Sequence, residues 1–424
     1  MTKNKLSNDS KSSKITDHIE ETVSDEEELE VVSLPEQQAF FKMPKRFGTI
    51  PDVSEKPLGW EKGGYEHIYP RVKLPTQWLD TRYFGNNGDA NKLYWGDNLH
   101  IMRTLPNESI DLIYIDPPFF SGRNYNMVFQ DQNEVMTFED IWDGGIPTYS
   151  IWLNARLLEM KRLLKSTGSI FVHLDWHAVH YIKIEMDKIF GYDNFRSEII
   201  WNSGSVSGFK SQKDGWIRQH DVILYYIKNK NYIFNKQYLP YKEEYIKKMF
   251  LYKDAKGRLY RKRRDGKQYL DESKGIPISD VWNDIYSIQT ITQSKEVIGY
   301  PTQKPEKLLQ RIIEATTNQG DVVADFFVGG GTTPAVAQRL GRRWIASDIS
   351  RIAVEVTKGR ILRLLKSEKG TQKGFDKVPD IEVWSWGFYD AERLQDATDG
   401  EFFPVFLIFS LKLSVSIFQL FEKS

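Results

Sequence analysis

Residues 321–333 read Asp-Val-Val-Ala-Asp-Phe-Phe-Val-Gly-Gly-Gly-Thr-Thr, an apolar run that ends in three glycines. The run has the length and composition of a buried parallel strand, and its Gly-Thr-Thr end is typical of a turn into a helix. Glycines let a backbone come close to a ligand, and the first turn of a helix offers free N–H groups. We therefore expect a strand, a tight turn and a helix that together form a ligand site.

A second carboxylate follows this turn at the spacing of a nucleoside site. Residues 343–348 predict the next strand, which ends at Asp348, 19 residues after Gly329. A carboxylate in this place accepts hydrogen bonds from ribose hydroxyls. An NAD site is one alternative, but the glycines do not follow G-x-G-x-x-G, and Asp325 would repel a pyrophosphate. Asp325 suits the ammonium of a methionine moiety instead; the other alternative is an ordinary tight turn beside a surface acid.

Strands and helices alternate on the N-terminal side of this stretch. Apolar runs predict further strands at residues 92–95, 111–115, 169–174, 198–201 and 221–226. Amphipathic spacing predicts helices at residues 150–165, between Val179 and Ile189, and after the proline-rich residues 301–305. This alternation is typical of an α/β fold with a doubly wound, mostly parallel sheet.

The predicted strand at 111–115 ends in Asp116-Pro117-Pro118-Phe119. Ligand sites of open α/β sheets lie beyond the carboxyl ends of the strands. The prolines restrict the backbone, so the Asp116 carboxylate and the Pro117 carbonyl become fixed acceptors, and Phe119 offers a face for a stacked base. Two acceptors and a ring suit an exocyclic amino group, because hydrogen bonds from its protons free its lone pair for attack on a sulfonium methyl. Such a base must leave the DNA stack; a rigid turn without chemistry is the alternative.

Composition excludes some functions. The chain has no cysteine, so disulfides, thiolate metal sites and the thiolate-dependent methylation of cytosine C5 are excluded. The 58 basic and 58 acidic residues cancel, but residues 1–35 hold nine acids against four lysines, and the rest is net basic. Scattered histidines without metal-ligand spacing are expected to be structural: His173, His177, His180 and His220. We therefore expect no metal ion. The polar N-terminus lacks a secretory signal, so we expect a cytoplasmic protein.

Residues 240–275 differ from the α/β pattern. They hold twelve Lys or Arg, six acids and five tyrosines, which favours a DNA-reading insertion. The candidate phosphate-binding side chains are Arg258, Arg261, Lys262, Arg263 and Arg264. A solvated charged surface is the alternative.

The tetrapeptide at 116–119, together with residues 301–305 and 325–333, resembles the DNA amino-methyltransferases of restriction–modification systems. The resemblance covers about residues 92–365. The tetrapeptide precedes the glycine-rich motif, as in the circularly permuted β class, where the DNA-reading insertion lies between the two. Stretches around 111–119 and 279–282 are similar to the modification subunits of type III systems.

This resemblance implies a Rossmann-like, S-adenosylmethionine-dependent enzyme that methylates N6 of a flipped-out adenine in double-stranded DNA. Asp at the first position of the tetrapeptide is the adenine-type residue, since cytosine-N4 members usually have Ser there. An N4-cytosine enzyme and a non-catalytic DNA-binding relative are the alternatives. A restriction subunit or a second copy of the chain is the expected protein partner, and no membrane is expected.

The resemblance also assigns roles to individual residues. Asp116, Pro117, Pro118 and Phe119 would be catalytic. The expected cofactor residues are Asp325, Phe327, Gly329, Gly331 and Thr332 at the methionine part, Asp348 at the ribose, Asp97 near the adenine ring, and Thr302, Lys304 and Pro305 in a closing segment. Three residues depart from the family pattern: Phe326 replaces Pro, Gly330 replaces Ser, and Phe119 replaces Tyr, so that the ring stacks but cannot hydrogen-bond.

The expected organisation has six segments: an acidic disordered tail at 1–35, an irregular lead-in at 36–90, a catalytic half at 91–239, the target-recognition insertion at 240–295, a cofactor-binding half at 296–370, and a C-terminal extension at 371–424. The extension ends in an apolar stretch at 402–419 whose alternation favours a half-buried strand or a disordered tail over a membrane segment.

Overall fold

The computed structural model describes residues 76–82, 90–122, 124–128, 134–140, 145–204, 214–264, 266–290, 294, 296–368 and 381–387. The chain divides into two units, Met1–Lys42 and Met43–Ser424, and every described residue belongs to the second. The predicted disordered tail at 1–35 and the predicted strand or tail at 402–419 lie outside the described residues. Among the residues that the structure describes, no helix combines the length and the apolar character needed to cross a bilayer.

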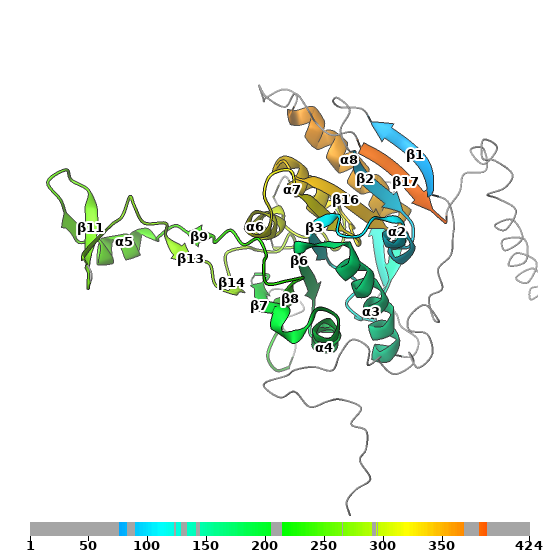
Figure 1. Ribbon diagram of the computed structural model, residues 1–424, viewed down its shortest axis with the longest axis horizontal. Coiled ribbons are helices and arrows are strands. Elements are labelled where there is room, and N and C mark those ends of the chain that lie inside the picture. The colour runs from blue at the N-terminus through cyan, green and yellow to red at the C-terminus, as the bar shows by residue number, and fades with distance from the viewer. Residues whose placement is uncertain are drawn as a thin grey trace, which may run out of the picture. The chain divides into compact units, whose positions relative to one another are not determined.

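A ten-stranded sheet forms the centre of the fold (Figure 1), in the order β1-β17-β2-β16-β15-β3-β6-β8-β7-β14. The strands are β1 Thr76–Arg82, β17 Ile381–Trp386, β2 Asn91–Trp95, β16 Arg343–Asp348, β15 Val322–Asp325, β3 Ile110–Ile115, β6 Leu164–Leu174, β8 His220–Ile227, β7 Phe195–Asn202 and β14 Val281–Trp282. Strands from β17 to β6 run parallel, whereas β8 is antiparallel to both of its neighbours, and β1 is antiparallel to β17. The sheet is therefore mostly parallel, as predicted.

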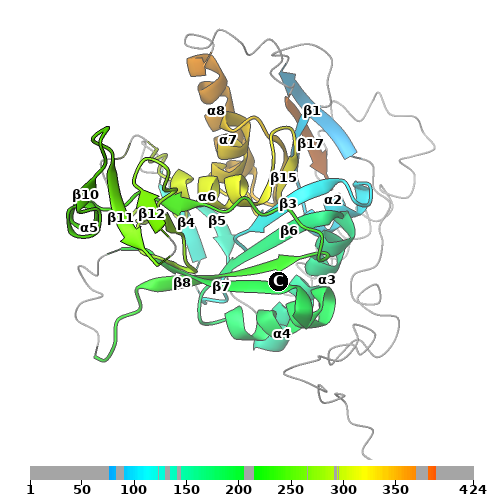
Figure 2. The same ribbon diagram turned by 60° about the vertical axis from the view of Figure 1, so that its left-hand side comes forward.

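Helices cover both faces of this sheet (Figure 2). One group is α2 Asn98–Thr104, α3 Gly145–Leu163 and α4 Val179–Phe190, and it shares a hydrophobic core with side chains such as Ile113 and Ile170. The other group is α6 Glu306–Thr316, α7 Thr332–Arg339 and α8 Arg351–Glu368, and it packs with side chains such as Leu112 and Val323. Adjacent residues of one strand thus enter different cores, as they do in a strand that is buried on both faces. The doubly wound arrangement is confirmed.

The winding changes direction between β15 and β3. These strands are parallel neighbours, with Ala324 opposite Ile113. The chain after β15 enters α7 on one face, whereas the chain after β3 continues to α3 on the other face. A ligand crevice is expected at such a switch point, outside the carboxyl ends of the two strands. Both predicted motifs begin there, at Asp116 and at Asp325.

Two strands at the sheet edge correct the sequence-based organisation. Residues 76–82 form β1, although 36–90 was expected to be irregular, and residues 381–386 form β17 within the extension of uncertain structure. β17 lies between β1 and β2, so each strand obtains its hydrogen bonds from a segment far away in the sequence. Local pattern alone does not reveal such pairing.

The insertion is a small structure of its own, drawn in green in Figure 1. Two short strands, β9 Tyr238–Leu239 and β13 Ile276–Pro277, pair at its base. Between them lie α5 Glu243–Met249 and a three-stranded sheet of β10 Tyr252–Lys253, β11 Leu259–Arg263 and β12 Gly266–Tyr269. The chain rejoins the main sheet at Val281, where β14 pairs with β7. This point lies within residues 240–295, the segment that was predicted as the insertion. The remaining elements are the hairpin β4 Asn124–Val128 and β5 Glu134–Glu139 and the short 3₁₀ helix Tyr192–Asn194.

Candidate active site

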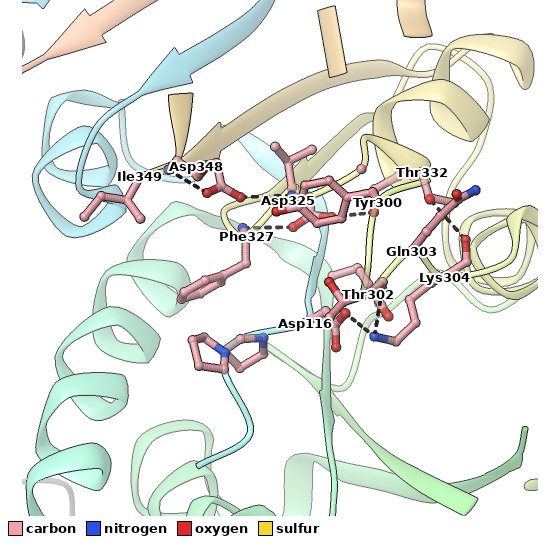
Figure 3. Close-up of a pocket in the computed structure, with 18 of the residues that line it drawn as sticks. Asp116, Tyr300, Thr302, Gln303, Lys304, Asp325, Phe327, Thr332, Asp348 and Ile349 are labelled. Atoms are coloured by element: carbon pink, nitrogen blue, oxygen red, sulfur yellow. Dashed lines mark hydrogen bonds and ion pairs between the residues drawn. The ribbon is translucent and has the colours of Figure 1, made fainter. Parts of the chain in front are cut away.

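A cavity of about 390 Å³ lies at the switch point, and residues from both predicted motifs line it (Figure 3). The predicted site residues in its wall are Asp116, Pro117, Pro118, Phe119, Thr302, Lys304, Asp325, Phe327, Gly329, Thr332 and Asp348. The predicted catalytic tetrapeptide and the predicted cofactor turn, about 200 residues apart in the sequence, thus face one space.

The Asp116 carboxylate has two different oxygens. Oδ2 forms an ion pair with Lys304 Nζ, from the loop before α6. Oδ1 is buried and has no hydrogen-bond partner among the described residues. A buried, unpaired acceptor is costly to maintain unless a ligand satisfies it. This oxygen is therefore positioned to receive an N–H donor.

The turn after the tetrapeptide is held by a buried acid. Asp140 is fully buried and accepts hydrogen bonds from the N–H groups of Phe120 and Ser121. Phe120 has φ +62°, which is uncommon for a residue with a side chain. The Tyr149 hydroxyl donates to the Pro118 carbonyl at 2.6 Å. These contacts and the two prolines fix the backbone on which Asp116 and Phe119 are carried.

The glycine turn is closely packed against Tyr300 and against Thr357 of α8. A Cβ on Gly329 would lie 3.2 Å from the Tyr300 ring, and a Cβ on Gly331 would lie 2.7 Å from Thr357 Oγ1. Gly331 also has φ +72° and starts α7. It does not line the cavity, so the structure explains this glycine by the packing of α7 on α8.

Two carboxylates face the cavity, of which Asp325 is buried and Asp348 is partly buried. Burial and the nearby charges of Asp116 and Asp348 raise the pKa of Asp325 to about 7, although hydrogen bonds from the Thr333 hydroxyl and the Phe327 N–H act to lower it. Burial raises the pKa of Asp348 to about 6, against hydrogen bonds from backbone N–H groups that include those of Gly329 and Ser350. Neither carboxylate forms an ion pair with another described residue. The cavity therefore presents anionic groups that a cationic ligand would stabilise.

Two further predicted cofactor residues lie outside the cavity wall. Asp97 follows β2 at the same sheet edge, but its carboxylate accepts from the Leu99 N–H, which begins α2, and from Arg156 at 2.9 and 3.0 Å. Pro305 precedes the first residue of α6. The structure thus places Asp97 and Pro305 in structural contacts and shows neither in the pocket.

Several wall residues escaped the sequence analysis. Trp152 on α3 packs edge-on against Phe327, with ring centroids 5.7 Å apart, and Arg156 lies over the Trp152 ring. Tyr300 covers the glycine turn, and Ile349 follows Asp348 with 59% of its surface exposed. Tyr300 immediately precedes the Pro301 motif and Ile349 immediately follows the second acid, so adjacency to the motifs was the available signal. Trp152 reaches the cavity only through the packing of α3.

The candidate DNA-binding cations fall into two groups. Arg261 is buried, with 7% of its surface exposed, and donates to the Tyr245 hydroxyl at 2.6 Å and to Gln268 at 2.9 Å. Its guanidinium also faces the ring of Phe250 at 5.2 Å. Arg258 is paired with Asp254 and lies 4.1 Å over the Tyr269 ring. Both arginines thus contribute to the packing of the insertion, and their contact with DNA stays a prediction.

The exposed candidates are Lys262, Arg263 and Arg264. We expect Lys262→Gln/Arg264→Gln to weaken DNA binding and to flatten the dependence of log Kd on log salt concentration by about one unit for each lost phosphate contact. Arg261→Gln should instead increase cleavage of the insertion by proteases, because it leaves an aromatic cluster without its central cation. Salt titrations of DNA affinity and limited proteolysis of both variants compare the two effects. A flatter salt dependence for Arg261→Gln with unchanged proteolysis would contradict the division.

A doubly wound sheet with a ligand cavity at its switch point is an architecture of α/β enzymes. Residues 110–359, more than half of the chain, match the model of the N6/N4 DNA methylase family. The chain therefore belongs to this family of DNA methylases, which agrees with the resemblance found in the sequence.

Individual relatives are consistent with this assignment. The type II methyltransferase M.BamHI of Bacillus amyloliquefaciens is 30% identical over 68% of this chain and 61% of its own length, so the match spans less than two thirds of that enzyme. The DNA adenine methyltransferase YhdJ of Escherichia coli K12 is 31% identical over 63% of this chain and 80% of its own. Among solved structures, the cytosine-N4-specific PvuII DNA methyltransferase has a TM-score of 0.41 and 17% identity, over 67% of this chain and 94% of its own.

Proposed function

We propose that this chain is a site-specific DNA methyltransferase that transfers the methyl group of S-adenosylmethionine to the exocyclic N6 of adenine. The observation that carries the proposal is the shared cavity, in which Asp116-Pro117-Pro118-Phe119 faces the glycine turn and its two carboxylates. Membership of the DNA methylase family supports both the reaction and the substrate.

The cavity suits a cofactor with a cationic amino-acid end and a nucleoside end. Asp325 is a buried carboxylate without an ion-pair partner among the described residues, and an ammonium group beside it would supply the missing charge. Asp348 accepts two backbone hydrogen bonds, and a carboxylate has further lone pairs for ribose hydroxyls. Phe327 and Trp152 give the wall an apolar surface. When bound, the cofactor supplies an electrophilic methyl group on a sulfonium.

The protein's own contribution is to orient the acceptor. Asp116 Oδ1 would accept a hydrogen bond from the amino group, and Phe119 would stack on the extruded base. Lys304 forms an ion pair with Oδ2, so the carboxylate that would contact the base is already oriented. Hydrogen bonding of the amino protons frees the nitrogen lone pair for attack on the methyl carbon.

Adenine is preferred over cytosine for two reasons. The tetrapeptide begins with Asp, the adenine-type residue of the resemblance, and the relative YhdJ is named as an adenine methyltransferase. We also propose a role in restriction–modification, as the relative M.BamHI is a type II methyltransferase. The type III likeness of residues 111–119, the partner subunit and the homodimer stay predictions.

The test is transfer of labelled methyl from S-adenosylmethionine to unmethylated double-stranded DNA, followed by nucleoside analysis, with Asp116→Ala as the control. We expect label in N6-methyladenine for the wild type and at least about 100-fold less for the variant in the same reaction time. Label in N4-methylcytosine would keep the reaction and overturn the base. Measurable cofactor binding without any label in DNA would overturn the proposed activity.

A further inference from the structure

A fully buried histidine lies directly behind the Asp116 carboxylate. His173 is on β6, which pairs with β3 on one side and β8 on the other, so its ring lies between Asp116 after β3 and Asp221 on β8. Nδ1 is 2.8 Å from the Tyr114 hydroxyl and 3.9 Å from Asp116 Oδ1. Nε2 is 3.5 Å from Asp221 Oδ2. The three side chains Asp116, His173 and Asp221 form a line, which we call the buried relay.

The surroundings of this ring are mostly apolar. The His173 ring is 5.7 Å from the Phe119 ring and 5.4 Å from the Trp201 ring, measured between centroids. Two atoms of the relay, Asp116 Oδ1 and His173 Nε2, are buried without a hydrogen-bond partner among the described residues. A histidine that only filled space would be expected to satisfy its polar atoms. The incomplete hydrogen bonding therefore favours a role that begins when substrate enters the site.

Charged groups surround the relay at both ends. Asp116 is paired with Lys304, and Arg218 Nη2 is 3.4 Å from Asp221 Oδ1. Burial acts to raise the pKa of Asp221, but the His173 ring beside it and the charges of Lys304 and Arg218 hold this pKa below its ordinary value. Asp221 therefore stays a carboxylate and can stabilise a cationic ring beside it. Its side chain is 15% exposed, so the relay ends near solvent.

The proposed reaction leaves a proton to be removed. With a bound cofactor supplying the methyl group and keeping the thioether as the leaving group, the new N–CH₃ bond would leave a positive charge on the amino nitrogen. Its proton passes first to the carboxylate that contacts it, Asp116. A neutral imidazole takes a proton readily near neutral pH. Closing the gap from Asp116 Oδ1 to His173 Nδ1 to hydrogen-bond distance needs an adjustment of about 1 Å, with rotation of the Tyr114 hydroxyl.

We propose that His173, oriented by Asp221, accepts from Asp116 the proton released by the methylated amino group and passes it toward solvent. The inference rests on the proposed function, because it needs an amino group in contact with Asp116. His173 is a positioning and proton-relay residue here, since it acts through Asp116 and does not touch the substrate. It replaces the structural role that the sequence predicted for this histidine.

The experiment measures single-turnover methyl transfer to DNA from pH 5.5 to 9 at saturating labelled cofactor. His177→Gln is the matched control, because His177 lies nearby but pairs with Asp175 outside the relay. We expect the wild-type rate to fall as pH is lowered, because a protonated ring cannot accept. His173→Gln should lower the rate at pH 8 by roughly 10²-fold and abolish this inflection. Because the cofactor is saturating, protonation of Asp325 and Asp348 should not change the rate through weaker cofactor binding.

Asp221→Asn provides a second test that does not alter the fully buried ring. Removing the carboxylate should move the midpoint of the profile to lower pH by about one unit, because an adjacent anion favours the protonated ring. An unshifted midpoint in Asp221→Asn, or a slow His173→Gln variant with the wild-type inflection, would overturn the relay. A wild-type chain that transfers no methyl to DNA would overturn the proposed function itself, so the two failures are distinguishable.

Discussion

Replacing Asp116 by alanine is expected to lower the rate of methyl transfer by about 10²- to 10³-fold, the usual cost of removing one preorganised polar contact to the reacting group. Cofactor affinity should change little, because Asp325 and Asp348 remain in place. The rate is measured in single turnovers at saturating cofactor, and affinity is measured by calorimetry.

The ion pair with Lys304 gives this prediction an internal control. Removing Asp116 leaves the Lys304 ammonium unpaired in a site where its side chain is only 14% exposed, so Asp116→Ala should also lower thermal stability. The double variant Asp116→Ala/Lys304→Met removes both charges and should recover most of that stability without recovering the rate. Recovery of the rate together with stability would mean that Asp116 acts only through folding.

Asp325→Asn should have two opposite effects, a loss of cofactor affinity and a gain in stability of the cofactor-free chain. The pKa of Asp325 is raised from 3.8 to about 7, so the folded state holds a carboxylate that it disfavours. A pKa raised by about three pH units costs on the order of 4 kcal/mol when the group is ionised. The cost is full above pH 7 and disappears as pH falls toward 4. The melting temperature of Asp325→Asn should therefore exceed that of the wild type at pH 8, with the difference shrinking at pH 5.

The affinity of the wild type for the cofactor should increase as pH rises. The wild type binds the ammonium with an ionised carboxylate, so its affinity should fall as pH drops below 7, and Asp325→Asn should bind roughly 10²-fold more weakly at pH 8. Asp321→Asn, immediately before the same strand, is the matched control and should leave affinity unchanged. A variant that melts at the wild-type temperature at pH 8 and still binds the cofactor normally would contradict both the buried charge and its role.

The central strands could be predicted because their residues carry the pattern themselves. Every residue of Ile110–Ile115 is buried, and an apolar run such as Leu112–Ile115 is what burial on both faces requires. Residues 76–82 and 381–386 carry no such run, and they become strands only because they pair with each other and with β2. The centre of the sheet is therefore predictable from its own residues, whereas this edge is not.

The same contrast applies to the site. Asp116, Asp325 and Asp348 each end a strand, so topology alone brings them to one crevice. The burial of Arg261 could not be predicted, because a basic side chain in a basic segment suggests an exposed position, whereas aromatic neighbours in the insertion enclose it. His173 lacked the spacing of any motif, and its relation to Asp116 and Asp221 depends on the pairing of three strands.

The position of β2 has a consequence for the newly made chain as it leaves the ribosome. The Asn91 side chain accepts from the Trp344 N–H, which lies 253 residues later. At about 5–20 residues per second, β2 therefore waits roughly ten to fifty seconds of synthesis for its neighbour β16. During that interval its buried side chains, Leu93 among them, have no native partner on that side. Cofactor binding can thus be acquired only after synthesis has passed Asp348, and until then the apolar strand is exposed to chaperones.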